Sequence, residues 1–523
     1  MDYDVAIIGS GFGGSVSALR LSEKGYRVAI LEQGNWVTPE DMEEGDTDVR
    51  RLNWLPSLGC TGYFSQDFFR HVTLVRGIGV GGGSIVYAAV LLRPKDDFYR
   101  DSAWCGLGID WKKELSPHCD TVEKMLGVTP NPNSDIQDQY LNKTAEKMGA
   151  GNTYGPTPNG IYFGKPEVMA PDPFFNGSGP HRAGCFLCGR CLTGCPHGSK
   201  NTLDKNYLYL AQRLGAAILP KRKVESIAPM ENGGYLLKLK HPAKPFYKYP
   251  PLKAKYVVVA AGVLGTLELL FHSRDVAKTL PAISSQIGRV VRTNSEAIVG
   301  VLSPETEMDL TYGTAISSHF YPDDNTHITQ NRFPIGYTFM KFFFGPIVDH
   351  PNPKARSFKT LVAIAAHPVS MAKNLFAKNW HKRITVLTVM QHIDNQISFT
   401  HGRKASFLFR RGLKSRAVEG KSAPTYLQVA NQAARTLGEV TGGQPLNVLT
   451  ESIGNTSTTA HILGGCHMGS SAETGVIDTS HQVFGYPGLY VIDGSAVSAN
   501  VGANPSLTIA ALAERAMSLI GPK

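Results

Sequence analysis

Two polar side chains near the end of the chain, His461 and Asn504, have the chemistry that alcohol oxidation requires. An alcohol carbon gives up a hydride only if its hydroxyl proton is held or removed at the same time. An imidazole titrates near physiological pH and can take that proton, while the Asn504 amide can orient the same hydroxyl. We predict that these two side chains form a catalytic pair and that His467, six residues after His461, is supporting structure.

The chain begins with the elements of a dinucleotide-binding unit. The unbroken apolar run at residues 4–8 predicts a buried parallel strand. A glycine-rich turn at 9–14, a helix around 16–21 and a second strand at 28–31 follow in that order. The complete strand–turn–helix–strand series within about 30 residues is more specific than the glycine motif alone.

Each motif position of this dinucleotide-binding unit has a physical role. Gly9 permits the tight turn, Gly11 lets a pyrophosphate approach the backbone, and Gly14 lets the helix pack on the strand. The helix N-terminus offers free N–H groups to phosphate. Glu32 can accept both hydroxyls of an adenosine ribose, which disfavours NADP, although the motif does not choose between NAD and FAD.

Two further sets of motifs lie far along the chain. One is the glycine run at 76–84 followed by Arg93-Pro94, and the other comprises 461–466, 489–495 and 502–506. Together with the first unit, in this order, they resemble the GMC (glucose–methanol–choline) oxidoreductase family, most closely its cholesterol-oxidase-like branch. The resemblance covers roughly the whole chain, with its firmest motifs in the first 95 and last 65 residues.

This resemblance implies FAD as the cofactor and an α/β fold. In that fold, a Rossmann-like FAD-binding domain is built from both chain ends, with an inserted α+β substrate-binding domain that contains an antiparallel sheet. It also places His461 and Asn504 over the reactive face of the flavin. The residues that it implies in cofactor binding are Gly9, Gly11, Gly14, Glu32, Gly79, Gly82, Gly83, Ser84, Val224, Ala261, Gly262, Asp493, Gly494, Asn504 and Pro505.

Two positions refine this expectation. Pro505 suits the first position of a helix over 506–519, whose positive end would follow Asn504 directly and, in the family, points at the flavin pyrimidine. Tyr87 stands where the cholesterol-oxidase pattern has an asparagine, so flavin positioning and reactivity with oxygen are expected to differ there.

The chain is expected to divide into four segments. Residues 1–130 hold the first part of the FAD-binding domain, including a flavin loop at 73–95. Residues 131–280 hold a Cys-rich insertion and, from about 200, further FAD-domain segments. Residues 281–435 form the substrate-binding domain, with strands near 298–302, 384–390 and 396–399. Residues 436–523 complete the FAD-binding domain.

Four cysteines, Cys185, Cys188, Cys191 and Cys195, have the spacing of a bacterial ferredoxin run. A [4Fe–4S] or [3Fe–4S] cluster and a metal-free, thiol-lined loop both remain open. A complete [4Fe–4S] ligand set would need Cys195 to fold back, or a distant residue such as Cys60 or Cys466.

The resemblance also implies a carboxylate besides the catalytic pair if a sterol substrate is isomerised. Glu296 is the weak candidate for moving the ring proton, and a solvent-facing glutamate on a strand is the simpler interpretation of this residue. Isomerase activity therefore stays unassigned.

Composition limits the partners and the location. The chain has 523 residues and a net charge of +10, but no nucleic-acid motif accompanies the charge. No apolar run has the length of a membrane span, and neither an export signal nor a twin arginine precedes the first strand. We expect a cytoplasmic protein. Between 350 and 393 seven basic residues and no acid interleave with apolar ones, which suits either peripheral contact with anionic lipid or a solvated flap over the active site.

The resemblance implies oxidation of a bulky hydrophobic secondary alcohol, a sterol or steroid 3-hydroxyl, to the ketone, within steroid and lipid metabolism. One alternative is an iron–sulfur-linked flavin dehydrogenase, or a ketone or enone reductase, of alicyclic substrates. The electron acceptor is then a quinone or protein rather than oxygen. A non-catalytic flavin- or lipid-binding protein is a third hypothesis.

Overall fold

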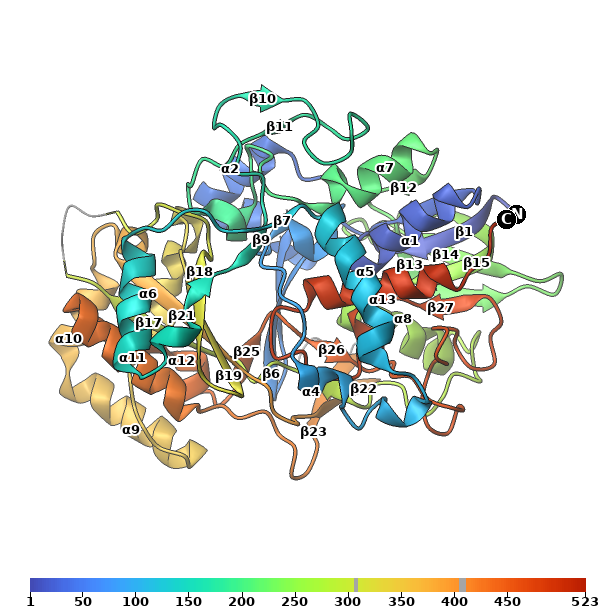
Figure 1. Cartoon of the computed structure of the whole chain (residues 1–523). Coiled ribbons are helices and arrows are strands. Elements are labelled where there is room, and N and C mark those ends of the chain that lie inside the picture. The colour runs from blue at the N-terminus through green and yellow to red at the C-terminus, as the bar shows by residue number, and fades with distance from the viewer. Residues whose placement is uncertain (305–308, 404–410) are drawn as a thin grey trace.

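The two ends of the chain meet in one mainly parallel sheet. The computed structural model describes residues 1–304, 309–403 and 411–523. The central strands are β1 (Tyr3–Ile8), β2 (Val28–Leu31), β12 (Ala217–Leu219), β15 (Lys248–Val259) and β27 (Leu489–Val491). The order β12-β2-β1-β15 is parallel, and β27 pairs with β15 in parallel too. In Figure 1 the two termini lie side by side at the edge of this layer.

Two helices from opposite ends of the chain cover this sheet together. Helix α1 (Phe12–Glu23) starts earlier than the predicted 16–21 and packs against α13 (Ser506–Ser518) (Figure 1). A Cβ on Gly14 would lie 2.1 Å from the Gly9 carbonyl oxygen, so glycine is required for this close helix–strand approach. Pro505 is the residue that caps α13 rather than its first helical residue.

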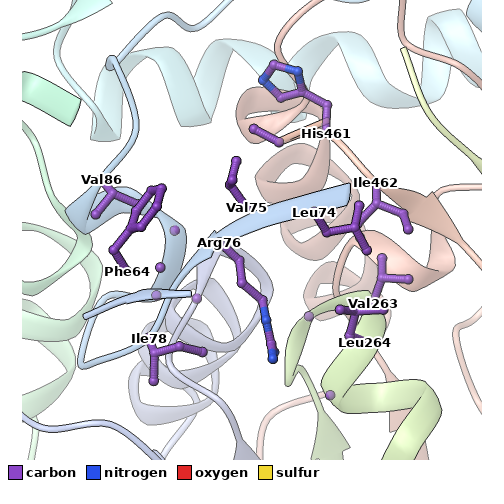
Figure 2. A pocket seen from close by; sticks show the side chains of 18 of the residues that line it. Phe64, Leu74, Val75, Arg76, Ile78, Val86, Val263, Leu264, His461 and Ile462 are labelled. Atoms are coloured by element: carbon purple, nitrogen blue, oxygen red, sulfur yellow. The ribbon is translucent and has the colours of Figure 1, made fainter. Parts of the chain in front are cut away.

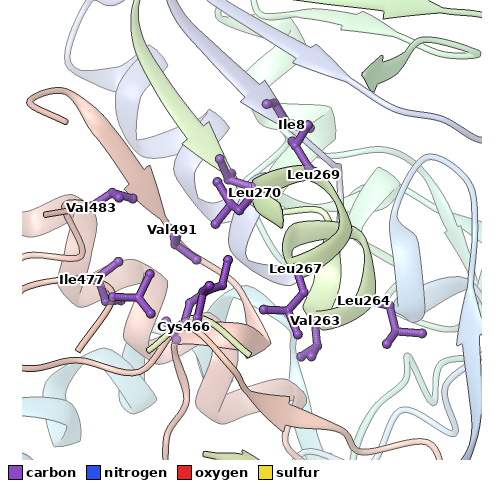
Figure 3. Packing of buried hydrophobic residues seen from close by; sticks show 14 of the residues in the cluster. Ile8, Val263, Leu264, Leu267, Leu269, Leu270, Cys466, Ile477, Val483 and Val491 are labelled. Atoms are coloured by element: carbon purple, nitrogen blue, oxygen red, sulfur yellow. The ribbon is translucent and has the colours of Figure 1, made fainter. Parts of the chain in front are cut away.

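Helix α8 (Gly262–Phe271) joins the parallel sheet to the C-terminal segment. Figure 3 shows its apolar side chains, Leu267 and Leu270 among them, packed with Ile477, Val491 and Cys466. This core holds the C-terminal segment of the site firmly beside the N-terminal one.

An antiparallel sheet forms the second half of the molecule. Its strand order is β20-β24-β17-β21-β19-β18-β8. The strands are β8 (Gly155–Pro156), β17 (Ala297–Leu302), β18 (Ser318–Asp323), β19 (Thr326–Asn331), β20 (Phe344–Pro346), β21 (Ile384–Gln391) and β24 (Gln444–Val448). Helices α6 (Ile136–Lys147) and α11 (Gln428–Thr441) pack on this sheet and share a core with it.

The antiparallel sheet includes strands from outside the predicted substrate-binding segment 281–435, because β8 precedes that range and β24 follows it. The predicted strand near 396–399 is β22 (Ile397–Arg403), which pairs with β23 (Arg411–Ala417) and with β16 (Val291–Arg292) in a separate sheet. Strand β26 (Leu463–Gly464), which begins two residues after His461, joins β16. Among the described residues, no helix is both long and apolar enough to span a membrane.

Candidate active site

One large cavity of about 940 Å³ lies between the two sheets. Figure 2 shows His461 of the C-terminal segment, Leu74 and Val75 of β6 (Val72–Gly77), and Val263 and Leu264 of α8 on its wall. Thirteen of the predicted site residues line it, namely Gly9, Gly11, Glu32, Gly82, Gly83, Val224, Ala261, Gly262, His461, Asp493, Gly494, Asn504 and Pro505. The volume lies near the upper end of the range for small-molecule sites, so it has room for a large ligand.

Glu32 marks one end of the cavity. Its Oε2 accepts hydrogen bonds from the Ser10 N–H at 3.1 Å and the Ser10 hydroxyl at 2.7 Å, and its Oε1 accepts from the Gly34 N–H at 2.8 Å. Burial raises the pKa of Glu32, and these donors oppose that shift by favouring the carboxylate. The carboxylate thus ties the glycine turn to the end of β2.

The glycine run after β6 forms another part of the wall. A Cβ added to Gly83 or to Gly11 would meet nothing within 4 Å, so both backbones face open space. A planar or charged ligand can therefore approach them closely.

Three predicted residues, Gly14, Gly79 and Ser84, do not line the cavity. Ser84 Oγ donates to the Gly81 carbonyl at 2.7 Å and accepts from the Leu203 N–H, which shapes the loop. Gly79 accepts from Ser10 Oγ through its carbonyl. Their roles are supporting ones.

Asp493 fixes the start of α8. Its Oδ2 accepts from the Gly262 N–H at 2.9 Å and from Thr266 Oγ1 at 2.5 Å, while Oδ1 accepts from the N–H and hydroxyl of Ser495. Burial raises the pKa of this carboxyl group. The bonds hold the backbones of 262 and 494 together on the cavity wall.

The structure brings His461 and Asn504 into contact. Asn504 Nδ2 lies 3.2 Å from His461 Nε2, and the His461 side chain is 15% exposed. Asn504 Oδ1 is buried and has no hydrogen-bond partner among the described residues. A buried amide oxygen without a partner is costly, so this atom is suited to a ligand donor. By contrast, His467 does not line the cavity and bonds the Thr474 carbonyl.

Glu296 is the candidate residue whose environment the sequence interpretation gave wrongly. It is buried, not solvent-facing, and its Oε1 lies 2.6 Å from His461 Nδ1. The Thr459 hydroxyl at 2.6 Å and the Ala460 N–H at 3.2 Å also donate to this carboxylate. Because Nδ1–H then donates to Glu296, His461 Nε2 carries the ring's lone pair, which accepts from Asn504 Nδ2 here and is the atom that can take a proton.

The residues just before Glu296 explain its position. Ser295 has φ 46°, a left-handed conformation that turns the chain into β17. Asn294 Nδ2 donates to the Ala503 carbonyl at 2.7 Å, directly before Asn504. The segment 294–296 therefore fixes both members of the catalytic pair, and a polar Asn-Ser-Glu triplet at the start of a buried strand was the available signal.

The four cysteines surround a second cavity of only about 20 Å³. That space accommodates about one water and is too small for a cuboidal cluster. In the described part of the chain, no three His, Cys, Asp or Glu side chains are arranged to hold a metal ion. Neither Cys60 nor Cys466 lines this cavity, and Cys466 lies instead in the core shown in Figure 3. The iron–sulfur hypothesis is thus not supported.

The cysteine segment instead braces the flavin loop. The buried Lys200 Nζ donates to the carbonyls of Ile85, Tyr87 and Cys191 at 2.7–3.0 Å. Burial raises the pKa of Cys191 to about 11, so its thiol stays protonated near neutral pH. Tyr87 lines the cavity, and its hydroxyl donates to the Asn201 carbonyl. These contacts favour the thiol-lined structural loop.

The residues present fit a flavin dinucleotide. The open backbones at Gly11 and Gly83, the acid at the end of β2 and the unpartnered Asn504 oxygen lie along one continuous cavity. The N-terminus of α13 lies directly after Asn504, where its positive end suits negative charge.

Comparisons with known proteins agree with this geometry. Residues 388–513 match the family model described as GMC oxidoreductase, and residues 7–46 match an NAD(P)-binding Rossmann-like domain. A cholesterol oxidase of Mycobacterium tuberculosis (strain ATCC 25618 / H37Rv) is 41% identical, covering 99% of this chain and 91% of the relative. A cholesterol oxidase of Acinetobacter baumannii is 40% identical, covering 100% of this chain and 95% of the relative.

Solved structures support the fold. Pyridoxine 4-oxidase from Mesorbium loti has a TM-score of 0.64 at 17% identity, with 98% of each chain covered. Near-complete coverage together with 40–41% identity to cholesterol oxidases identifies the enzyme class. The chain belongs to the GMC oxidoreductases, flavoenzymes that oxidise CH–OH donors, and to their cholesterol-oxidase-like branch.

Proposed function

We propose that this protein oxidises a bulky hydrophobic secondary alcohol, a sterol or steroid 3-hydroxyl, to the ketone, with oxygen as the electron acceptor. The observation that carries the proposal is the Glu296–His461–Asn504 constellation on the wall of a large cavity. The names of the two cholesterol oxidases related over the whole chain support the substrate class.

The substrate part of the cavity is largely apolar, with Thr329, Asn331 and Thr388 as polar members of its wall. Beside the catalytic pair it is lined by side chains of β17, β21, β24 and the segment 333–343, which are Ile298, Phe333, Tyr337, Phe339, Met340, Phe343, Val386, Met390 and Val448. Burying a rigid hydrocarbon against such walls is favourable by about 25 cal/mol per Å² of apolar surface. A polycyclic alcohol therefore gains affinity from its ring system, while its hydroxyl is directed to the polar end.

The catalytic residues act on the hydroxyl proton. His461 Nε2 accepts that proton as the hydride leaves the alcohol carbon, and Glu296 holds Nδ1–H so that Nε2 faces the substrate. Asn504 Nδ2, which bonds His461 Nε2 at 3.2 Å without substrate, is placed to donate to the same oxygen. Bound FAD supplies the two-electron acceptor for the hydride.

The hydrogen bonds of Glu296 also argue against a role for this carboxylate in isomerisation of the sterol ring. Glu296 accepts three hydrogen bonds from protein groups within 3.2 Å, so it is committed to orienting His461. We therefore assign Glu296 a positioning role and not the role of base in isomerisation.

Anaerobic mixing with sterols tests the proposal. The flavin absorbance of the holoenzyme should bleach with a 3-hydroxysteroid and return with oxygen as peroxide forms. His461→Ala and Asn504→Leu should retain bound flavin yet bleach at least about 100-fold more slowly, since a general base contributes about 10²–10⁴-fold. No bleaching by any sterol would overturn the substrate. Bleaching that oxygen does not reverse would overturn the acceptor, in favour of a quinone or protein.

A further inference from the structure

Helices α9 (Pro353–Ala366) and α10 (Pro368–Leu375) form a surface whose chemistry the active site does not use. They lie at the outer edge of the antiparallel half, far from the parallel sheet (Figure 1). Five large apolar side chains on and just after them are exposed: Phe358 68%, Leu361 53%, Val362 49%, Val369 67% and Phe376 82%. Such a concentration exceeds scattered apolar exposure and marks an interaction site.

The exposed charged side chains of the same surface are all positive. Lys354, Lys359, Lys373 and Lys378 are exposed, and none of them makes an ion pair in the described part of the chain. The other basic residues of the stretch are engaged elsewhere: Arg356 is buried, Arg383 bonds the Ser303 carbonyl, and Lys382 pairs with Asp309. Four free cations interleaved with apolar groups complement an anionic, apolar layer.

The surface is continuous with the wall of the active-site cavity. Asn374 of α10 donates through Nδ2 to the Lys341 carbonyl at 2.9 Å, and Lys341 belongs to η8 (Ile335–Phe343). Phe343 of the same segment lines the cavity and is also 38% exposed, while the neighbouring Phe342 is 62% exposed. Phe343 thus connects the cavity wall to the exposed Phe342 beside α10.

We propose that α9, α10 and the exposed end of η8 dock on an anionic lipid bilayer and place the cavity opening against it. The apolar side chains enter the acyl boundary, and the four lysines lie at the level of the headgroups. α9 and α10 themselves do not line the cavity, so they are a docking platform and not a flap over the catalytic residues. That a substrate enters from the bilayer rests on the proposed function, whereas docking itself does not.

Co-sedimentation of the FAD-loaded enzyme with vesicles tests docking without any turnover. Vesicles of phosphatidylcholine alone are compared with vesicles that also contain phosphatidylserine, at low and high salt. The charge variant is Lys354→Gln, Lys359→Gln, Lys373→Gln and Lys378→Gln together. Its control replaces four exposed lysines elsewhere, Lys113, Lys143, Lys238 and Lys253, by Gln. The apolar variant is Phe358→Ser, Leu361→Ser and Phe376→Ser. Its control is Phe246→Ser, since Phe246 is 99% exposed on the connection between β14 (Tyr235–Lys240) and β15.

The enzyme should partition to phosphatidylserine-containing vesicles and be released by salt. The charge variant should bind at least about tenfold more weakly, because each of the four lysines contributes roughly fivefold near an anionic surface. The apolar variant should lose binding, and both controls should keep it. Equal binding of variants and controls, or absence of binding to anionic vesicles, overturns the proposal. A dimer in solution that only the apolar variant dissociates would instead assign this surface to a second copy of the chain.

Turnover measurements distinguish membrane docking from the proposed oxidation of a sterol. If docking is correct, both surface variants should oxidise a detergent-dispersed sterol at the normal rate and a vesicle-embedded sterol at least about tenfold more slowly, as expected when membrane binding sets substrate supply. An enzyme that docks on vesicles but oxidises no sterol in either form would retain docking and overturn the substrate.

Discussion

Glu296 Oε1 lies 2.6 Å from His461 Nδ1, although 165 positions separate the two residues in sequence. The carboxylate is 3% exposed and also accepts from Thr459 and Ala460. A buried acid bonded to one imidazole nitrogen fixes which nitrogen faces the cavity. In the proposed mechanism, this hydrogen bond orients His461 as the base.

Replacing the acid should disable this orientation. Glu296→Gln can donate to His461 Nδ1 and so favours the tautomer with its proton on Nε2. We expect flavin reduction at least about 100-fold slower with unchanged FAD content, as in other histidine–carboxylate pairs. Stopped-flow reduction across pH checks this. Thr459→Val removes a hydroxyl that donates to Glu296 and accepts from the His461 N–H, but it leaves the Glu296–His461 hydrogen bond itself in place, so this control should lose far less. Normal reduction by Glu296→Gln would rule out the positioning role.

Filling the open space beside Gly83 should exclude the cofactor. The backbone at Gly83 has no positive φ, and a new Cβ meets nothing within 4 Å, so Gly83→Val should fold. The added methyl groups occupy the cavity wall. We expect at least about tenfold weaker FAD binding, since a clash of this size typically costs 1–3 kcal/mol. Visible absorbance per protein measures it, and Gly106→Val, also without neighbours within 4 Å, should keep its flavin.

Narrowing the apolar part of the cavity should discriminate by substrate size. Ile298 of β17 lines the cavity two residues after Glu296. Ile298→Trp should raise KM for a four-ring 3-hydroxysteroid by about tenfold or more, because overpacking costs about 1–3 kcal/mol. A single-ring alcohol such as cyclohexanol should be turned over at its usual kcat/KM. Equal loss for both alcohols would mean that the substitution disturbs the catalytic groups instead.

Acid should destabilise the protein through His481. This side chain is buried, its Nδ1 lies 3.0 Å from the Val491 carbonyl oxygen, and burial lowers its pKa from 6.5 to about 4. Between these values the unfolded chain binds the proton and the folded one does not, so stability falls as pH falls from about 6.5 to about 4. The loss approaches about 3 kcal/mol at 1.36 kcal/mol per pKa unit.

The matched variant for this prediction is His481→Gln. It should be less stable than the unsubstituted enzyme at pH 7.5, yet its melting temperature should fall less between pH 7.5 and pH 4.5. Parallel decreases in the two proteins would assign the acid sensitivity to other groups.

The sequence determined the parts of this protein that depend on neighbouring residues. The glycine turn after β1, the acid after β2 and the glycine run after β6 could be read locally, because each requirement concerns backbone approach within one turn. The strands β17 and β21 followed from apolar runs in the same way. Ordered motifs also identified His461 and Asn504 as a pair.

Only the tertiary structure decided how distant segments share one site. Sequence could not show that Glu296 faces inward, since burial of a carboxylate depends on donors at Thr459 and Ala460 that the fold brings to it. Nor could spacing show that Cys185 to Cys195 enclose a space of about 20 Å³ braced by Lys200. Ferredoxin-like spacing constrains the chain between ligands, but the packing around it sets the volume left for a cluster.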